Sequence, residues 1–121
     1  KVRSRGKKLS CAVFDDYSER AVKERLQPWL GWLEDGLIDS AVVMAYGREP
    51  DGVISRVENI CNIHGSLKGI RVGLGAFNYA GRWDDFIGLV KRVRKMDPDE
   101  ITFFALSSID EELAGKLKAL D

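Results

Sequence analysis

The sequence has no excess of charge of either sign. Its 121 residues contain 19 Lys plus Arg and 19 Asp plus Glu, so the formal net charge is zero. Nucleic acids and anionic membranes attract basic surfaces, and this balance gives no electrostatic reason to expect either partner. We therefore expect no nucleic-acid binding.

Long apolar runs and metal-binding residues are also scarce. No stretch approaches the ~20 apolar residues that a helix needs to cross a bilayer, so we expect no membrane span. Cys11 and Cys61 lie far apart in apolar surroundings, which favours two buried thiols over a disulfide. No Cys/His cluster has metal-ligand spacing, and no phosphate-loop signature occurs. We expect no metal and no cofactor.

What the sequence does contain is a repeated alternation of strand-like and helix-like segments. Four apolar, β-rich runs start about every thirty residues, the length of one strand-plus-helix unit, and they cover residues 8–14, 39–46, 70–77 and 100–106. The segments between them have helical periodicity. Near-continuous apolar strands are typical of parallel strands covered by helices. The pattern predicts one α/β domain over residues 1–121, built from four βα units with parallel strands.

Helix boundaries are marked by turn-forming and capping residues. Pro28 interrupts the first helical segment, so a fresh helix is expected near Gln27, and Gly36 supplies a left-handed stop. Ser108 and Glu111 have the spacing of a capping box and are predicted to open the last helix.

Two architectures accept four such units. One is the C-terminal half of a (βα)8 TIM barrel, and the alternative is a small open doubly wound sheet. Periodicity alone leaves both open.

A resemblance favours the barrel. In "WLGWLEDGLIDSAVVMAYG" the sequence resembles bacterial glycosyl-hydrolase-like barrel proteins formerly filed as a domain of unknown function. The family pattern W-x-x-W-L-x-x-G-x-x-D, leading into a strand that reads roughly P-M-x-Y, is matched by Trp29, Trp32, Leu33, Gly36, Asp39, Met44 and Tyr46, with Val43 in place of the proline. "IRVGLGAFN" and "EITFFALSSI" resemble the family's seventh and eighth strands. The resemblance implies the C-terminal half of the barrel only, and by family a protein that is exported or associated with the bacterial cell envelope.

Half a barrel would leave two strand edges and one sheet face uncovered. That topology motivates two hypotheses for the protein partner: a homodimer, or the missing N-terminal half-barrel. Flattening into an open sheet with helices on both sides is the other physical solution.

In parallel α/β folds, ligands bind beyond the carboxyl ends of the strands. This rule selects the candidate substrate-binding residues Asp15, Asp16, Tyr46, Arg48, Asn78, Tyr79 and Ser107. Aromatic rings beside carboxylates, an amide and an arginine suit a carbohydrate, because rings cover the apolar face of a pyranose and polar groups fix its hydroxyls.

Each of these residues also has a structural interpretation. Asp16 and Ser18 are expected equally well to cap the next helix, and Asn78 to occupy a turn. Tyr46 either lines a pocket or ends a core strand with its hydroxyl in solvent. His64, on a helix beside Gly65, is expected to be a helix-end residue.

Catalysis has the least support. Glycoside hydrolysis normally needs two carboxyl groups on either side of the scissile bond. Asp15 is the single candidate we name, and the strand that resembles the family's seventh ends in Asn78 without a carboxylate. The resemblance therefore implies a glycoside-hydrolase-like fold, and we expect it to contribute sugar-binding loops without hydrolysing glycosidic bonds alone. The alternatives are a non-enzymatic, self-contained α/β module that binds a ligand or protein, and a piece that serves assembly only.

Overall fold

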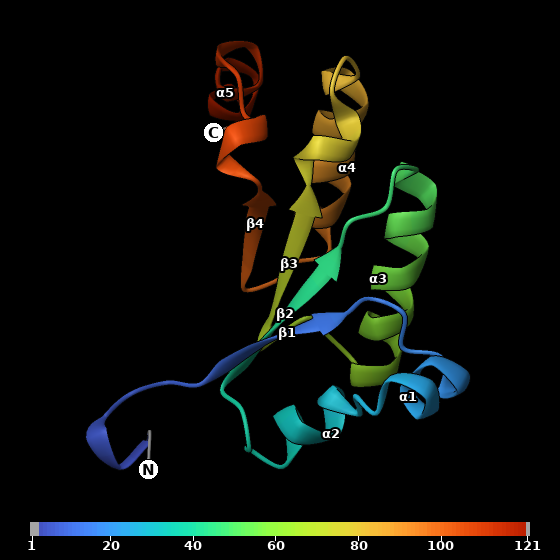
Figure 1. Ribbon diagram of the computed structural model, residues 1–121, viewed down its shortest axis with the longest axis vertical. Coiled ribbons are helices and arrows are strands. Elements are labelled where there is room, and N and C mark those ends of the chain that lie inside the picture. The colour runs from blue at the N-terminus through green and yellow to red at the C-terminus, as the bar shows by residue number, and fades with distance from the viewer. Residues whose placement is uncertain (1–2, 121) are drawn as a thin grey trace.

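The computed structural model describes residues 3–120, in which strands and helices alternate as the sequence predicts (Figure 1). The strands are β1 (Ser10–Phe14), β2 (Ser40–Ala45), β3 (Ile70–Gly75) and β4 (Glu100–Phe104). The helices are α1 (Glu19–Arg25), α2 (Trp29–Glu34), α3 (Pro50–His64), α4 (Trp83–Lys95) and α5 (Glu111–Lys118), with short 3-10 helices η1 (Arg3–Arg5), η2 (Ala76–Tyr79) and η3 (Leu106–Ser108). The predicted domain span of 1–121 includes Lys1, Val2 and Asp121, which lie outside the described residues.

All strand pairs are parallel, and their spatial order is β1-β2-β3-β4, the order along the chain. The predicted α/β class with four parallel strands is therefore confirmed. Within residues 3–120 the sheet is open, because β1 pairs only with β2 and β4 pairs only with β3. The sheet thus has two free edges.

The helices cover one face of this sheet. Figure 1 shows α3 and α4 on the same side of the strands, and every helix from α2 to α5 contributes to one buried apolar cluster with β1, β2 and β3. Alternation along each strand sends Val13, Val43 and Val72 into that cluster, at most 1% exposed. The open sheet of the alternative prediction is thus observed, with its helices on one side.

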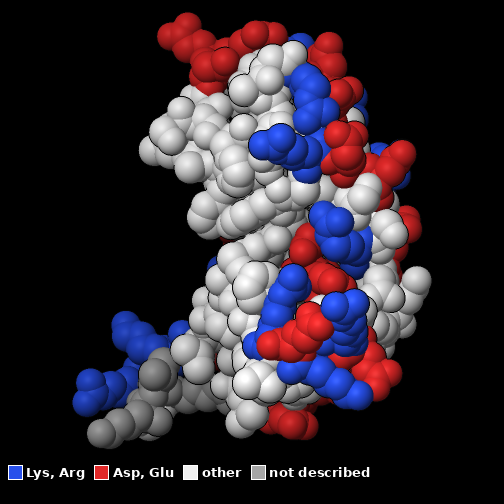
Figure 2. Space-filling view, turned by 45° about the vertical axis from the view of Figure 1, so that its right-hand side comes forward, with Lys and Arg blue, Asp and Glu red and all other residues white. Residues whose placement is uncertain are grey.

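The opposite face, which we call the open face, carries the other half of the strand residues. Phe14, Met44, Gly73 and Thr102 lie in one row across all four strands. Phe14 is 41% exposed although it is a large apolar residue. In Figure 2 the hollowed left margin of the molecule is formed by uncharged residues, whereas charged side chains gather on the right.

The predicted helix boundaries are confirmed at three turns. The α1 helix ends at Arg25, the next residue, Leu26, adopts a left-handed backbone with φ 53°, and α2 begins at Trp29 directly after Pro28. Gly36 has φ 71°, and Gly65, which ends α3, has φ 92°. Since side chains disfavour this conformation, glycine is the expected residue at the last two positions.

The predicted capping box at the last helix is wrong. The α5 helix begins at Glu111, and its cap is Asp110, whose carboxylate accepts a 2.8 Å hydrogen bond from the Leu113 amide. Ser108 belongs to η3 instead. An Asp one residue before the helix satisfies the free N–H groups of the first turn, so a cap two residues earlier is not needed.

Cys11 and Cys61 are free thiols, as the sequence indicates, but both are half-buried and not fully buried as expected. Burial raises the pKa of the Cys11 thiol. None of the helices in residues 3–120 combines the length and apolar character that crossing a bilayer requires.

Candidate ligand site at the carboxyl ends of the strands

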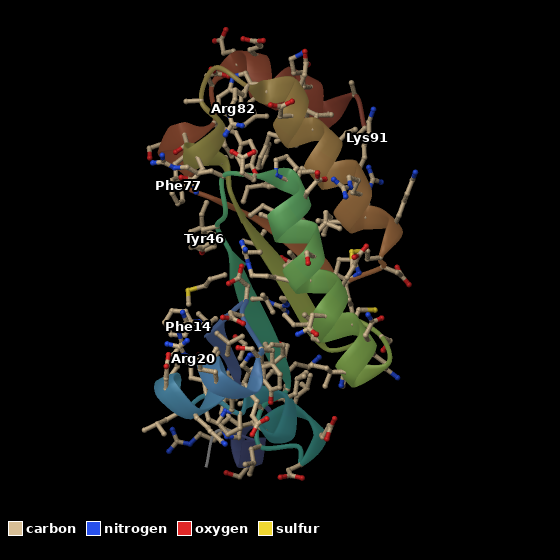
Figure 3. The ribbon with its side chains drawn as sticks, turned by 90° about the vertical axis from the view of Figure 1, so that its right-hand side faces the viewer. Phe14, Arg20, Tyr46, Phe77, Arg82 and Lys91 are labelled. Carbon is tan, nitrogen blue, oxygen red and sulfur yellow. The ribbon has the colours of Figure 1, made fainter. Side chains whose placement is uncertain are left out.

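Three aromatic side chains meet on the open face where β2, β3 and β4 end. The Tyr46 ring lies 5.8 Å from the Phe77 ring in an edge-to-face arrangement and 5.3 Å from the Phe104 ring, measured between centroids. Phe77 is 48% exposed and Phe104 is 40% exposed. Figure 3 shows Phe14, Tyr46 and Phe77 along one side of the molecule, opposite Lys91 of α4. We call Tyr46, Phe77 and Phe104 the aromatic cluster.

Two glycines of β3 make room for this cluster. A Cβ on Gly75 would lie 3.0 Å from the Phe77 ring and 3.2 Å from the Tyr46 Cβ, and one on Gly73 would lie 3.5 Å from the Tyr46 ring. From the sequence, Gly73 and Gly75 are expected to let a neighbouring backbone or a ligand approach the strand closely. In the structure, their missing Cβ atoms let neighbouring rings lie flat over β3.

Tyr46 offers the one phenol of the cluster. Burial raises the pKa of its hydroxyl, so the group stays protonated and can donate a hydrogen bond at neutral pH. Among the described residues the hydroxyl has no hydrogen-bond partner, although the side chain is half-buried. The hydroxyl is therefore free to bond a ligand.

Asp15, the candidate catalytic residue, is held by an ion pair. Its Oδ2 accepts a 2.6 Å hydrogen bond from Nε of Arg56 on α3, and the Asp15 side chain is 17% exposed. Gly47 leaves room for this contact, because a Cβ at this position would lie 2.5 Å from the Arg56 guanidinium. The carboxylate therefore already ties the loop after β1 to α3.

Of the two residues expected to cap the first helix, Ser18 is the cap and Asp16 supports the turn before it. Its Oδ1 accepts a 3.1 Å hydrogen bond from the Ser18 amide, and the Ser18 hydroxyl accepts one of 3.1 Å from the Ala21 amide to cap α1. Its carboxylate thus shapes the turn into the helix.

Asn78 and Tyr79 fasten η2 to the loop that follows β2. The Asn78 side-chain amide donates to the Tyr46 carbonyl, and the Tyr79 hydroxyl donates a 3.0 Å bond to the Gly47 carbonyl. Arg82 extends the arrangement by donating to the carbonyls of Arg48, at 3.0 Å, and Asn78, at 3.1 Å. These side chains position the backbone around Tyr46.

Tyr79 is fully buried, with an exposed fraction of 0%. Burial is the main cause that raises the pKa of its hydroxyl, with the nearby Arg82 charge acting in the opposite direction. The Arg82 guanidinium lies 4.9 Å from the centre of the Tyr79 ring. Buried and already bonded, this hydroxyl is not accessible to a ligand.

The last two predicted residues are exposed. The Arg48 side chain lies at the surface of the loop after β2, and Ser107 lies on η3 beside Leu106, which is 85% exposed. Both are at the carboxyl ends of the strands, where they were predicted.

Sequence reasoning missed Phe104 and Arg56 as parts of this region. Alternation along β4 gave the available signal for Phe104, because Glu100, Thr102 and Phe104 must share one face. No sequence signal linked Arg56 to Asp15, since the two residues lie 41 positions apart.

Outside the aromatic cluster, a hollow of about 490 Å³ lies at the same end of the sheet, between the starts of α4 and α5, and its lining includes Arg82, Trp83 and Asp110. Within residues 3–120 no group of three His, Cys, Asp or Glu side chains could hold a metal ion. A groove of about 660 Å³ lies elsewhere, on the helix side between β4, α4 and α5. The aromatic cluster lines neither hollow, and the exposed rings of Phe77 and Phe104 make it a surface wall.

Neither the family models, the curated proteins nor the solved structures that we searched contain a match to this chain.

Proposed function

We propose that this chain is the C-terminal half of a glycoside-hydrolase-like (βα)8 barrel and that its aromatic cluster forms a sugar-binding wall. The observation that carries the proposal is the aromatic cluster itself, which lies on the uncovered face of the sheet at the carboxyl ends of the strands. In a barrel this face is the inner wall and this end holds the ligand.

The arrangement of the strands supports the barrel half of the proposal. Four parallel strands in chain order with helices on one face form the arc that consecutive units of a barrel would make. A doubly wound sheet would instead place helices on both faces. The resemblance in the Trp29-to-Tyr46 segment agrees with the barrel.

The chemistry of the wall supports a carbohydrate. Exposed rings of Phe77 and Phe104 provide apolar contact area, and the free Tyr46 hydroxyl provides a polar contact beside them. A pyranose has an apolar face bordered by hydroxyl groups, so it matches this combination.

The same geometry argues that the chain does not hydrolyse glycosidic bonds alone. Hydrolysis needs one carboxylic acid and one carboxylate on either side of the bond. Asp15 is engaged by Arg56, and Asp16 by the Ser18 amide. A catalytic pair would have to come from residues outside this chain.

The self-contained binding module stays a second candidate, because Asn78 and Tyr79 bond backbone carbonyls rather than facing solvent. Under that alternative the aromatic cluster is an apolar contact surface for a protein or small ligand.

The test is a titration of the chain with soluble β-linked gluco- and N-acetylgluco-oligosaccharides, followed by amide chemical shifts. We expect shifts clustered at residues 44–47, 73–78 and 102–106. Tyr46→Ala and Phe77→Ala should each weaken binding about fivefold, since loss of one ring contact corresponds to about 1 kcal/mol.

Leu37→Ala is the matched control, because Leu37 is 62% exposed and lies in the α2–β2 loop, away from the strand ends. Shifts that spread over other surfaces, or no shifts at millimolar sugar, would refute the sugar-binding wall.

A further inference from the structure

The free edge of β4 borders the groove between β4, α4 and α5. This groove has a volume of about 660 Å³, and its lining combines the apolar residues Val90, Pro98, Ile101, Phe103, Leu117 and Leu120 with the charged residues Arg94, Asp97 and Lys118. Acidic residues Asp99 and Glu100 lie at the amino end of the same edge, where Asp99 accepts a 3.1 Å hydrogen bond from the Gly69 amide and Glu100 lies 3.6 Å from Arg71. The β4 edge is therefore mostly apolar along the strand and acidic where the strand begins.

The free edge of β1 has the opposite charge. The exposed residues Lys7 and Lys8 precede this strand, and they are followed by Leu9 and Phe14, each 41% exposed. The β1 edge is thus apolar along its length and basic where the strand begins.

We propose that the β4 edge binds the β1 edge of a second copy of this chain, in parallel, so that two half-sheets close into one ring of eight strands. The proposal rests on the half-barrel architecture proposed above. One twofold axis makes both junctions identical, so a single type of contact closes the ring and removes every free strand edge.

The register of this junction follows from barrel geometry. A closed (βα)8 barrel staggers its strands by a total of about eight residues, so each identical half must supply about four. Across the sheet, Cys11 is level with Ala41 and Ile70, and the β3–β4 register places Ile70 level with Asp99. A four-residue stagger then sets Asp99 beside either Lys7 or Asp15 of the second copy. Only Lys7 lets β4 overlap β1.

This register brings complementary groups together. Glu100 falls beside Lys8 of the second copy, and Asp99 beside its Lys7, so the acidic and basic strand starts meet. Ile101 falls beside Leu9 of the second copy on the helix side of the sheet. The Leu9 side chain of each copy would enter the groove of the other copy. This contact explains why Leu9 and the groove are both exposed in a single chain.

Closure would also place the aromatic clusters of the two copies at the same end of the barrel, on opposite sides of its opening. Phe104 falls beside Ala12 of the second copy, and its small side chain leaves the ring free to face the centre. The ring of eight strands would therefore hold two identical sugar-binding walls.

The first experiment measures molar mass by light scattering and sedimentation at micromolar to hundred-micromolar chain concentrations. We expect twice the 13.6 kDa mass of the chain. Leu9→Asp and the double variant Lys7→Glu/Lys8→Glu should dissociate the dimer while their circular dichroism stays that of a folded chain. Ile63→Asp is the matched control, since Ile63 is 53% exposed on α3, away from both edges, and should leave the dimer intact.

The second experiment tests the register by disulfide trapping in a Cys11→Ala/Cys61→Ala background. Ser10→Cys combined with Thr102→Cys should give a covalent dimer on mild oxidation, because the two positions would be neighbours across the junction. Within one chain they lie on opposite edges of the sheet, about 14 Å apart across the strands and about 13 Å apart along them, because Thr102 is level with Phe14 and not with Ser10. This separation is too large for a disulfide. Ala12→Cys combined with Thr102→Cys is offset by two residues and should cross-link poorly.

A monomer at every concentration would overturn the proposal and would indicate that a different chain covers this edge. A dimer that survives Leu9→Asp, or one that Ser10 and Thr102 fail to trap, would overturn the β4–β1 junction. The sugar titration is independent of both results, because Tyr46→Ala leaves the edges unchanged. Failure of the dimer therefore does not count against the sugar-binding wall.

Discussion

Single residues decide where side chains lie on the open face. Gly73 and Gly75 remove the two Cβ atoms that would hold the Tyr46 and Phe77 rings away from β3. Gly47 does the same for the Arg56 guanidinium beside Asp15. In each case a bulky side chain from another element occupies the space that a side chain at the glycine would fill, because interior atoms pack without gaps.

At this scale we predict that Tyr79 makes stability fall at alkaline pH. Burial raises the pKa of the folded-state hydroxyl above the ordinary value of 10.0, so the unfolded chain loses its proton first. This contribution to the free energy of unfolding is complete below that ordinary pKa and is lost as the pH rises through the folded-state pKa.

Tyr79→Phe should lower the free energy of unfolding by about 1 kcal/mol at pH 7, because it removes the bond to the Gly47 carbonyl. Its stability should then decline less than that of the parent chain above about pH 10. Urea unfolding at pH 7 to 11 measures both effects. Equal alkaline slopes in the two proteins would contradict this role for Tyr79.

At the scale of elements, one side chain, Asp110, connects two helices. Asp110 accepts hydrogen bonds from the Leu113 amide, at 2.8 Å, and from the Trp83 indole, at 3.2 Å. It therefore begins α5 and also joins α5 to the start of α4. The Trp83 side chain is 8% exposed.

Asp110→Ala should destabilise the chain by about 1 kcal/mol or more, since it removes the cap and leaves the indole N–H without its acceptor. Ser108→Ala should change stability by less than about 0.5 kcal/mol, although sequence spacing assigns the cap to Ser108. Thermal and urea unfolding of the two variants measure the difference. A larger loss from the Ser108 variant would restore the capping box.

At the scale of the whole molecule, the core is one-sided. Helix-facing side chains such as Phe86 are 0% exposed, whereas the open face keeps Phe14, Phe77 and Phe104 at least 40% exposed. Phe86 contacts the rings of Tyr79, Trp83 and Phe103. Stability should therefore depend on the helix side and binding on the open face.

Phe86→Ala should cost about 3–5 kcal/mol, a large part of the total stability of a small domain. Phe77→Ala removes the same side chain from the open face and should cost about 1 kcal/mol or less. Denaturant midpoints provide the comparison. Similar losses would show that the open face is packed as tightly as the helix side.

Much of the fold could be predicted from local patterns. The runs ending at Phe14 and Tyr46 were recognised because parallel strands buried by helices are almost continuously apolar. Gly36 and Gly65 marked helix ends because few other residues adopt a left-handed backbone. The cap was misassigned to Ser108 because two possible caps lie close together in this stretch. Ser108 has a Glu three residues later, as in a capping box, whereas Asp110 accepts the hydrogen bond from the amide of Leu113, three residues after it.

The candidate site was predictable in place but not in composition. Tyr46, Asn78 and Tyr79 were expected at the strand ends, and all lie there. Which of them faces a ligand depends on contacts between residues more than thirty positions apart, such as the bond from Tyr79 to Gly47. Local patterns carry no information on such pairs.

The sequence by itself determined the alternation of strands and helices, the parallel class of the sheet and most helix ends, because these depend on neighbours within one or two turns of chain. Only the tertiary structure decided that the helices share one face, that Asp15 pairs with Arg56 and that Tyr46, Phe77 and Phe104 converge over two glycines. The physical reason is that these contacts arise from packing between separate βα units, and a one-dimensional pattern does not specify which side chains meet there.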